Sequence, residues 1–446
     1  MNPNPSEPID TLIDARWVIP VEPAGSVLSD HSVAIKNGTI VAVLPSADAA
    51  RRFQAAEHLR LDRHALIPGL INLHTHAAMN LLRGLADDLP LMTWLQEHIW
   101  PAEAKHVSAQ FVQDGSLLAC AEMLRGGVTC FNDMYFFPEA AAKAAQHMGM
   151  RAALGLITIE FPTAYARDPD DYLAKGLAMR DALRGDPLLS FCMAPHAPYT
   201  VSDKSFERIV TIAEELDTPI HMHLHETAEE IATSLKQHGV RPLERLRRLG
   251  VVGPRLIAVH AVHLDNSELD LLAKHGASVA HCPSSNLKLA SGIAPVAAML
   301  ARGINLGLGT DGAASNNRLD MFQEMRQAAL LAKGASGNAE AMPARAALEA
   351  ATLGAARALG LEKCIGSIVP GKAADLTAVQ FDPVDLAPCY DPLSHLVYAA
   401  GREHVSHVWV AGRKLIENRC FSCLDTVILE KTALLWHNKL VAESIG

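Results

Sequence analysis

Leu66-Ile67-Pro68-Gly69-Leu70-Ile71-Asn72-Leu73-His74-Thr75-His76 is an apolar run that ends in two histidines, and the rest of the chain is best understood from it. The run predicts a buried strand over Leu66–Leu73. Side chains alternate faces along a strand, so His74 and His76 point the same way. Imidazole is the commonest protein ligand for a catalytic divalent metal. The stretch therefore indicates a metal-binding pair at the end of a buried strand, although such a pair alone is also compatible with two structural histidines.

The composition fits a large domain with a smaller one attached. The chain has 446 residues, of which 49% are hydrophobic and 20% charged. A net charge of −10 opposes binding to a nucleic-acid backbone, which requires clustered lysine and arginine. No apolar run reaches the ~18–20 residues that cross a bilayer. Residues 1–8 lack the basic region and apolar core of a signal peptide, and the eight cysteines, including the Cys420–Cys423 pair, are expected to be reduced thiols.

From these features we expect a cytoplasmic protein with no nucleic-acid or membrane partner. The sequence is compatible with a homo-oligomer but does not set the oligomeric state.

Short apolar runs alternate with longer helical stretches through the middle of the chain. The eight predicted strands are Leu66–Leu73, Gly127–Asn132, Ala152–Thr158, Leu188–Met193, Pro219–His223, Leu256–Val262, Ser278–His281 and Asn305–Gly309. Alternating strands and helices imply a parallel sheet, and eight repeats predict a closed (β/α)8 TIM barrel. An open doubly wound sheet is the alternative. It is weakened because His74 and His76 stand where a Gly-rich phosphate loop would follow the first strand.

Both ends of the chain are predicted to be rich in β-structure. Val33–Lys36 and Thr39–Val43 flank Asn37-Gly38, which supplies the positive φ angles of a type I′ hairpin turn. Strand character returns after residue 371, and a helix is expected over Thr426–Val441.

We therefore predict an α/β fold in three segments. Residues 67–368 are expected to form the (β/α)8 barrel. Residues 1–66 and 369–446 pair into one small β-sandwich, and the second of these segments also carries the terminal helix.

Polar residues gather at the ends of six of the eight predicted strands. Catalytic groups in a barrel stand at the C-terminal ends of its strands. The residues found there are His74, His76, His196, His221, His223, His225, Glu226, His260, His263, His281 and Asp311. A buried histidine requires hydrogen-bond partners, so this many at one rim would be costly without a function.

These residue types suit hydrolysis assisted by a divalent metal. His74, His76, one histidine of the fifth predicted strand and Asp311 can serve as ligands. A bound metal lowers the pKa of its water toward about 7, which supplies hydroxide at neutral pH. No lysine ends the fourth strand, where a carbamylated lysine could bridge two metals, so we expect a single metal. Imidazole and carboxylate ligands accept Zn²⁺, Fe²⁺ and Mn²⁺ alike.

The fifth predicted strand leaves the choice of its ligand open. His221, His223 and His225 share one strand face, and we favour supporting or structural roles for His221 and His225. Glu226 follows directly, where a carboxylate can move protons. Its alternative is a solvated residue in the first turn of a helix.

Three other hydrolase and nucleotide motifs are missing from the sequence. The second zinc-deaminase signature, H-x-E followed by P-C-x-x-C, is absent. So are G-x-S-x-G and the Walker A loop.

Nearly the whole chain resembles the amidohydrolase superfamily, and more narrowly its methylthioadenosine/S-adenosylhomocysteine deaminases, which are neighbours of the triazine hydrolases. The matching stretches are Pro68–His76, Asn80–Gly84, Ser285–Leu289, Gly309–Asn317 and Pro370–Leu376. The resemblance implies a zinc site made by His74, His76, His223 and Asp311.

The resemblance also implies how the reaction is divided among residues. Glu226 would move a proton to the purine ring nitrogen as hydroxide attacks the carbon that bears the amino group. His260 and Asp311 would orient and deprotonate the metal-bound water, and ammonia would leave. Glu103 matches a ribose-binding glutamate, with a carboxylate at a helix start as the alternative, and His196 matches a substrate-contacting histidine.

One position departs from the pattern of some relatives, which carry an arginine on the third strand that can meet the homocysteine carboxylate. Here Arg151 begins that strand, and Leu156 takes the other position by alignment. A charged amino-acid tail loses a partner there, whereas a methylthio group or a 5′-hydroxyl loses nothing.

We therefore expect hydrolytic deamination of methylthioadenosine or adenosine, with S-adenosylhomocysteine disfavoured. The enzyme alternative is a deaminase or chlorohydrolase of another aminated heterocycle, such as guanine, a pterin or a triazine. A non-catalytic scaffold is opposed by the intact ligand set together with Glu226.

Overall fold

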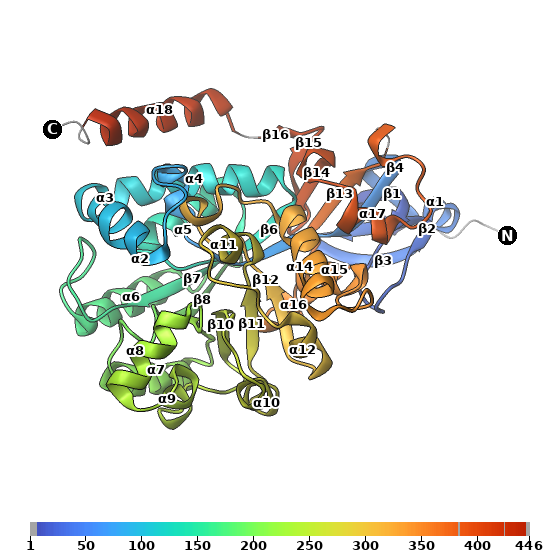
Figure 1. Ribbon diagram of the computed structural model, residues 1–446. Helices are drawn as coiled ribbons and strands as arrows, with labels where there is room; N and C mark the ends of the chain where they lie inside the picture. The colour runs from blue at the N-terminus through green and yellow to red at the C-terminus, as the bar shows by residue number, and fades with distance from the viewer. Residues whose placement is uncertain (1–6, 382–383, 423, 443–446) are drawn as a thin grey trace.

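Two sheets organise the computed structural model, which describes residues 7–381, 384–422 and 424–442. One is an eight-stranded parallel sheet surrounded by helices, and the other is an eight-stranded mixed sheet formed by the two ends of the chain (Figure 1). Residues 1–6 and Cys423 lie outside the described residues, so the expectations about a signal peptide and the Cys420–Cys423 pair rest partly on residues the structure does not describe.

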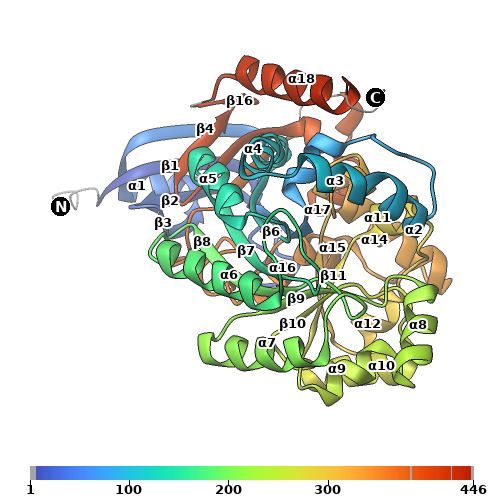
Figure 2. The ribbon, with the colours of Figure 1, turned by 90° about the vertical axis from the view of Figure 1, so that its left-hand side faces the viewer.

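The parallel sheet contains eight strands in sequence order, seven at the predicted places and the first over the second half of its predicted range. They are β5 (Leu70–Thr75), β6 (Val128–Asp133), β7 (Arg151–Thr158), β8 (Leu189–Pro195), β9 (Ile220–Leu224), β10 (Leu256–His260), β11 (Ser278–His281) and β12 (Asn305–Leu308). The larger helices between and after them are α4 (Ala109–Arg125), α5 (Pro138–Met148), α6 (Pro169–Leu183), α7 (Asp203–Leu216), α8 (Ala228–His238), α10 (Asn266–His275) and α14 (Met321–Ser336). Figure 2 shows α4 to α10 arranged around the outside of these strands.

The first and last parallel strands are joined, which closes the sheet into a barrel. The Asn72 side chain on β5 accepts a hydrogen bond from the Thr310 backbone nitrogen (2.9 Å) and donates one to the Thr310 hydroxyl (2.7 Å). The backbone nitrogen of Asp311 donates to the carbonyl of His74 (3.0 Å). These contacts confirm the barrel over the open sheet, and they bring two predicted metal ligands side by side.

The predicted strand Leu66–Leu73 is in fact divided between the two sheets. β4 (Phe53–Pro68) belongs to the mixed sheet, and β5 begins one residue after Gly69. The Gly69 nitrogen donates to the Asp375 carbonyl (2.9 Å), and a Cβ here would lie 2.1 Å from the Thr129 hydroxyl oxygen. The sequence does not show this passage from one sheet to the other, because the residues on both sides of Gly69 are apolar and buried.

The mixed sheet combines strands from both chain ends, as predicted. In spatial order it runs β16 (Cys420–Phe421), β15 (Arg413–Glu417), β14 (Val405–Val410), β13 (Leu376–Gln380), β4, β1 (Glu7–Val18), β2 (Leu28–Lys36) and β3 (Thr39–Pro45). The antiparallel pair β4–β13 joins the two ends. Asn37 and Gly38 have φ angles of 50° and 74°, which confirms the expected hairpin turn.

The edge strand β3 folds back toward the middle of this sheet. The Ile40 nitrogen donates to the Lys372 carbonyl (2.9 Å), and the Gly371 nitrogen donates to the Ile40 carbonyl (2.8 Å). The sheet thereby encloses its own apolar core, which includes Val33, Leu376 and Trp409. The boundaries proposed near residues 66 and 368 remain predictions.

The predicted terminal helix is α18 (Thr426–Ala442), which lies along α4 (Figures 1 and 2). Trp436 packs edge-on against Phe111, with ring centroids 5.1 Å apart, and its indole nitrogen donates to Asp114 (2.8 Å). Within the described ranges, no helix is long and apolar enough to span a membrane.

Candidate active site

Five barrel strands deliver polar side chains to one rim of the barrel. His74 and His76 come from the end of β5, and His223 lies on β9. The others are His196 just after β8, His260 at the end of β10 and Asp311 just after β12. All sit at the C-terminal ends of their strands, the rim at which barrels carry their functional groups.

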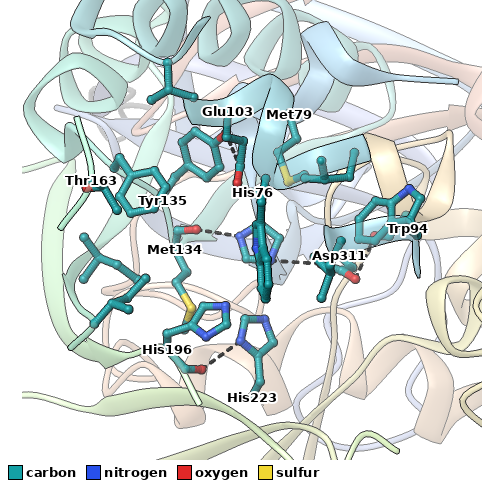
Figure 3. Close-up of a pocket in the computed structure, with 18 of the residues that line it drawn as sticks. His76, Met79, Trp94, Glu103, Met134, Tyr135, Thr163, His196, His223 and Asp311 are labelled. Atoms are coloured by element: carbon teal, nitrogen blue, oxygen red, sulfur yellow. Dashed lines mark hydrogen bonds and ion pairs between the residues drawn. The ribbon is translucent and has the colours of Figure 1, made fainter. Parts of the chain in front are cut away.

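The ligand atoms of these residues converge in two overlapping groups. One group contains His74, His223 and His260, the other contains His74, His76 and Asp311, and the ligand atoms within each group lie within 4.8 Å of one another. The Oδ1 atom of Asp311 lies 3.3 Å from Nε2 of His74. It lies 3.2 Å from Nε2 of His76 (Figure 3). The structure thus brings the four predicted ligands together and adds His260 beside them.

Backbone carbonyls set the tautomers of two of these histidines. Nδ1 of His76 lies 2.5 Å from the Met134 carbonyl, and Nδ1 of His223 lies 2.8 Å from the His196 carbonyl (Figure 3). A carbonyl only accepts, so each Nδ1 carries the hydrogen. In its neutral state each ring presents a bare Nε2 lone pair to the site, which is the state that binds a metal. Burial opposes protonation of His76, but its contact with Asp311 raises its pKa to about 9, so a metal would displace the proton from its Nε2.

The buried environment of His74 also fits a cation. Its Nδ1 lies 2.9 Å from Nε2 of His221, whereas its Nε2 is buried and has no hydrogen-bond partner among the described residues. Burial lowers the pKa of His74 to about 4, so the ring is neutral at pH 7 and retains a lone pair. A buried polar atom without a partner is costly, and a divalent metal would satisfy it. The donor set at this rim therefore suits a divalent metal.

Asp311 is held by two hydroxyls from the short helices α11 (Pro283–Lys288) and α13 (Ala313–Asn316), both in stretches that the sequence already singled out. Ser285 and Ser315 each donate to Oδ2 (2.7 Å), and the Gly312 nitrogen donates to Oδ1 (2.8 Å). Burial opposes ionisation, but the close approach of the two β5 histidines holds the pKa of Asp311 well below its usual range. An oriented, ionised carboxylate therefore faces the histidines.

Glu226 places a second carboxylate at the site. Its Oε2 lies 3.8 Å from Nε2 of His260, and its Oε1 accepts a long hydrogen bond from Ser291 (3.4 Å). Nδ1 of His260 lies 2.8 Å from the side-chain oxygen of Asn286. Burial raises the pKa of Glu226, so this carboxyl can hold and release a proton.

A cavity of about 480 Å³ opens over these groups. Its floor carries the polar residues His76, His196, His223, Glu226, His260 and Asp311. Its other walls are largely apolar and include Trp94, Ile99, Trp100, Phe136, Ile157 and Phe161. None of the described residues that line it is a lysine or arginine.

One acidic group lies on the wall that covers the metal ligands. Glu103 belongs to α3 (Trp100–His106), and it accepts a hydrogen bond of 2.5 Å from the hydroxyl of Tyr135 (Figure 3). Glu103 therefore faces the same cavity as His196, as expected if both contact a substrate.

The Amidohydrolase family model matches residues 65–415. The chain belongs to the amidohydrolase family. It is 48% identical over 98% of both chains to a protein of Saccharophagus degradans named 5-methylthioadenosine/S-adenosylhomocysteine deaminase. An adenosine deaminase from Xanthomonas campestris, solved with bound zinc, has a TM-score of 0.97 and 52% identity, covering 98% of this chain and 100% of the other. Atrazine chlorohydrolase from Arthrobacter aurescens, also solved with zinc, has a TM-score of 0.88 and 25% identity over 96% and 99% of the two chains.

Two further histidines of this amidohydrolase support the site without entering it, as we expect from the sequence. His221 lies behind His74. Nε2 of His225 accepts from the Leu243 nitrogen (3.1 Å), so its Nδ1 carries the hydrogen and donates to the His263 carbonyl (3.2 Å).

Sequence reasoning missed Glu230, which holds the loop that carries Glu226. Its two carboxylate oxygens accept from the backbone nitrogens of His225 and Glu226, both at 2.9 Å, and His225 has a φ of 55°. Thr227 caps α8, so Thr227-x-x-Glu230 is a recognisable helix-start pattern. The pattern predicts the start of the helix, but it does not predict that the Glu230 carboxylate accepts hydrogen bonds from residues 225 and 226, which precede the cap.

The structure corrects the placement of Leu156 in this amidohydrolase. Its side chain packs against Gly176 of α6, outside the cavity, while the next residue, Ile157, lines it. Adjacent residues of a strand face opposite ways, so Leu156 and Ile157 lie on different faces of β7. Arg151 is also remote, because it is buried against Asp375 (2.7 Å) at the opposite end of β7.

Proposed function

We propose that this amidohydrolase removes the amino group of an adenine nucleoside by hydrolysis and releases the inosine analogue and ammonia. One zinc ion per chain would be held by His74, His76, His223 and Asp311. The main support is the convergence of these ligand atoms beside Glu226, a buried carboxyl with a raised pKa. The adenosine deaminase solved with zinc at 52% identity supports the same choice of metal and substrate.

The chain's own residues have distinct tasks in this reaction. The metal, when bound, supplies a nucleophilic water at neutral pH. Asp311 and His260 orient that water and accept its proton. Glu226 delivers a proton to the purine ring nitrogen as the neighbouring carbon is attacked, and the amino group leaves as ammonia.

The cavity favours a nucleoside over a bare heterocycle. Glu103 can accept hydrogen bonds from ribose hydroxyls, and His196 contacts the base or sugar from the opposite side. Guanine and triazines have no sugar to meet Glu103. The relative at 25% identity is a chlorohydrolase, whereas relatives near 50% identity carry deaminase names, which also favours the nucleoside.

The 5′ substituent should be small or apolar. None of the described residues that line the cavity is a lysine or arginine to meet a homocysteine carboxylate. Leu156 lies outside the cavity, so this preference rests on the absence of a cationic side chain among the described residues that line it. Methylthioadenosine or adenosine should therefore be used better than S-adenosylhomocysteine.

Ammonia release by zinc-loaded protein over a substrate panel tests this function. The panel contains methylthioadenosine, adenosine, S-adenosylhomocysteine, guanine and melamine. Turnover of the adenine nucleosides with the first two preferred is expected. Turnover of guanine or melamine alone would retain a deaminase and contradict the nucleoside assignment, and a higher kcat/KM for S-adenosylhomocysteine would contradict the 5′ preference.

A further inference from the structure

Tyr135 forms a close contact with Glu103 on the cavity wall. Tyr135 follows β6 and is 5% exposed, whereas Glu103 comes from α3, more than thirty residues earlier. The phenol oxygen lies 2.5 Å from Oε1 of Glu103, and both residues line the cavity (Figure 3). A loop of the barrel thus holds a side chain that belongs to the covering helix.

In this hydrogen bond Tyr135 is the donor and Glu103 is the acceptor. A phenol facing a carboxylate donates its hydrogen, so the bond occupies Oε1 and leaves Oε2 to accept hydrogen bonds from the cavity. Carboxylate side chains have freely rotating terminal torsions, and a donor on one oxygen restricts that rotation. Tyr135 therefore sets where the second oxygen stands.

We propose that Tyr135 is a positioning residue for the ribose: it orients the Glu103 carboxylate to accept the vicinal hydroxyls of a nucleoside. This inference rests on the proposed function. Tyr135 acts through Glu103, so its contribution falls on binding of the sugar rather than on the chemical step.

The pKa of Glu103 also supports a positioning role for Tyr135. Burial raises the pKa of Glu103, and the hydrogen bond from Tyr135 opposes that rise. Without the phenol the buried carboxyl would hold its proton to higher pH. A protonated carboxyl presents a donor where the sugar hydroxyls require an acceptor.

The test is Tyr135→Phe in the full-length, zinc-loaded protein. Tyr165→Phe is a matched control, because Tyr165 is also 5% exposed and its hydroxyl has no hydrogen-bond partner among the described residues. Metal content and Tm are measured for both, and steady-state kinetics are compared for adenosine and 2′,3′-dideoxyadenosine.

Tyr135→Phe should raise KM for adenosine roughly tenfold, as for the loss of one hydrogen bond to a charged group. Its kcat, its metal content and its KM for dideoxyadenosine should stay within about twofold of the wild-type values. Tyr165→Phe should leave kcat and KM unchanged for both nucleosides. Equal changes for both nucleosides, or none for either, would overturn the inference.

Glu103→Gln provides a second measurement that keeps the inference testable if Tyr135→Phe is unstable. It should show the same selective loss for adenosine, and the double variant should be no worse than Glu103→Gln alone, because the two residues act as one unit. Additive losses would contradict the positioning role.

The kinetics of the wild-type protein with the two nucleosides distinguish a failure of this inference from a failure of the proposed function. A wild-type protein that deaminates both nucleosides with equal KM retains the proposed function and refutes the ribose role. A wild-type protein that releases ammonia from neither nucleoside refutes both.

Discussion

The Nε2 atom of His260 lies 3.8 Å from Oε2 of Glu226, although the two residues follow different strands of the barrel. His260 has a φ of 68°, in the left-handed region that non-glycine residues rarely adopt. Strained backbone of this kind is found at functional sites, where the surrounding structure maintains it. The pair places a buried carboxyl beside an imidazole in the lining of the cavity.

Glu226→Gln should keep its metal and lose turnover. The amide has the same shape but cannot release a proton, and positioned acid–base groups contribute about 10²–10⁴-fold to a rate. Ammonia release and metal content are measured on the same sample. Glu229→Gln, at an exposed position three residues away, is the matched control and should behave as wild type. Retained activity in Glu226→Gln would show that another group moves the proton.

Asp311→Ala should lose metal and activity together. Asp311 faces two ligand histidines and is held by two serine hydroxyls, so its removal leaves those histidines without a charged partner. Metal bound per chain after gel filtration is the measurement. Asp181→Ala, which removes a largely exposed carboxylate, is the control. Full metal occupancy in Asp311→Ala would remove this residue from the ligand set.

Glu230→Gln should lower both stability and kcat while metal content stays unchanged. The amide nitrogen cannot accept from a backbone N–H, so one of the two nitrogens that Glu230 binds becomes unsatisfied. A buried donor without a partner costs about 1–3 kcal/mol of unfolding free energy. Chemical denaturation and steady-state kinetics measure the two effects. A variant with reduced stability and wild-type kcat would show that Glu230 supports the helix start without orienting Glu226.

The stability that protonated Glu324 contributes to the folded protein should be lost as the pH rises toward neutrality. Glu324 is buried on α14 and accepts from the Ser284 nitrogen and the Asn316 side chain, and burial raises its pKa from 4.5 to about 7. A carboxyl whose pKa is raised on folding contributes stability that is full below pH 4.5 and is lost as pH rises through about 7.

The measurement is the slope of unfolding free energy against pH in wild type and in Glu324→Gln, both loaded with zinc. The variant should have the flatter slope between pH 4.5 and 7, whatever its absolute stability. Parallel slopes would mean that Glu324 has the same proton affinity in the folded and unfolded states.

The barrel and its ligand positions could be predicted because they follow from local patterns. Strands alternate faces with a period of two, so His74 and His76 had to share a face, and parallel strands in a barrel bring their ends to one rim. The hairpin at Asn37-Gly38 follows from the same kind of local rule, since few residues accept its backbone angles.

What could not be predicted depends on contacts between distant segments. The exchange of sheets at Gly69 is set by Asp375 and Thr129, which are far away in the sequence. The contact of Tyr135 with Glu103 joins a strand end to a covering helix, and neither residue type indicates the other. Leu156 was expected beside the substrate but packs against Gly176, because every residue of β7 is buried and the sequence does not show which face lines the cavity.

The central claim is that this amidohydrolase uses a bound divalent metal to deaminate an adenine nucleoside. The most direct test measures ammonia released per methylthioadenosine consumed, by protein of known metal content, before and after chelation and after zinc is restored. We predict one ammonia per nucleoside at about one metal per chain, loss of activity in the stripped protein and recovery with zinc. Undiminished turnover by metal-free protein, or no ammonia from any adenine nucleoside by the zinc-loaded protein, would contradict the claim.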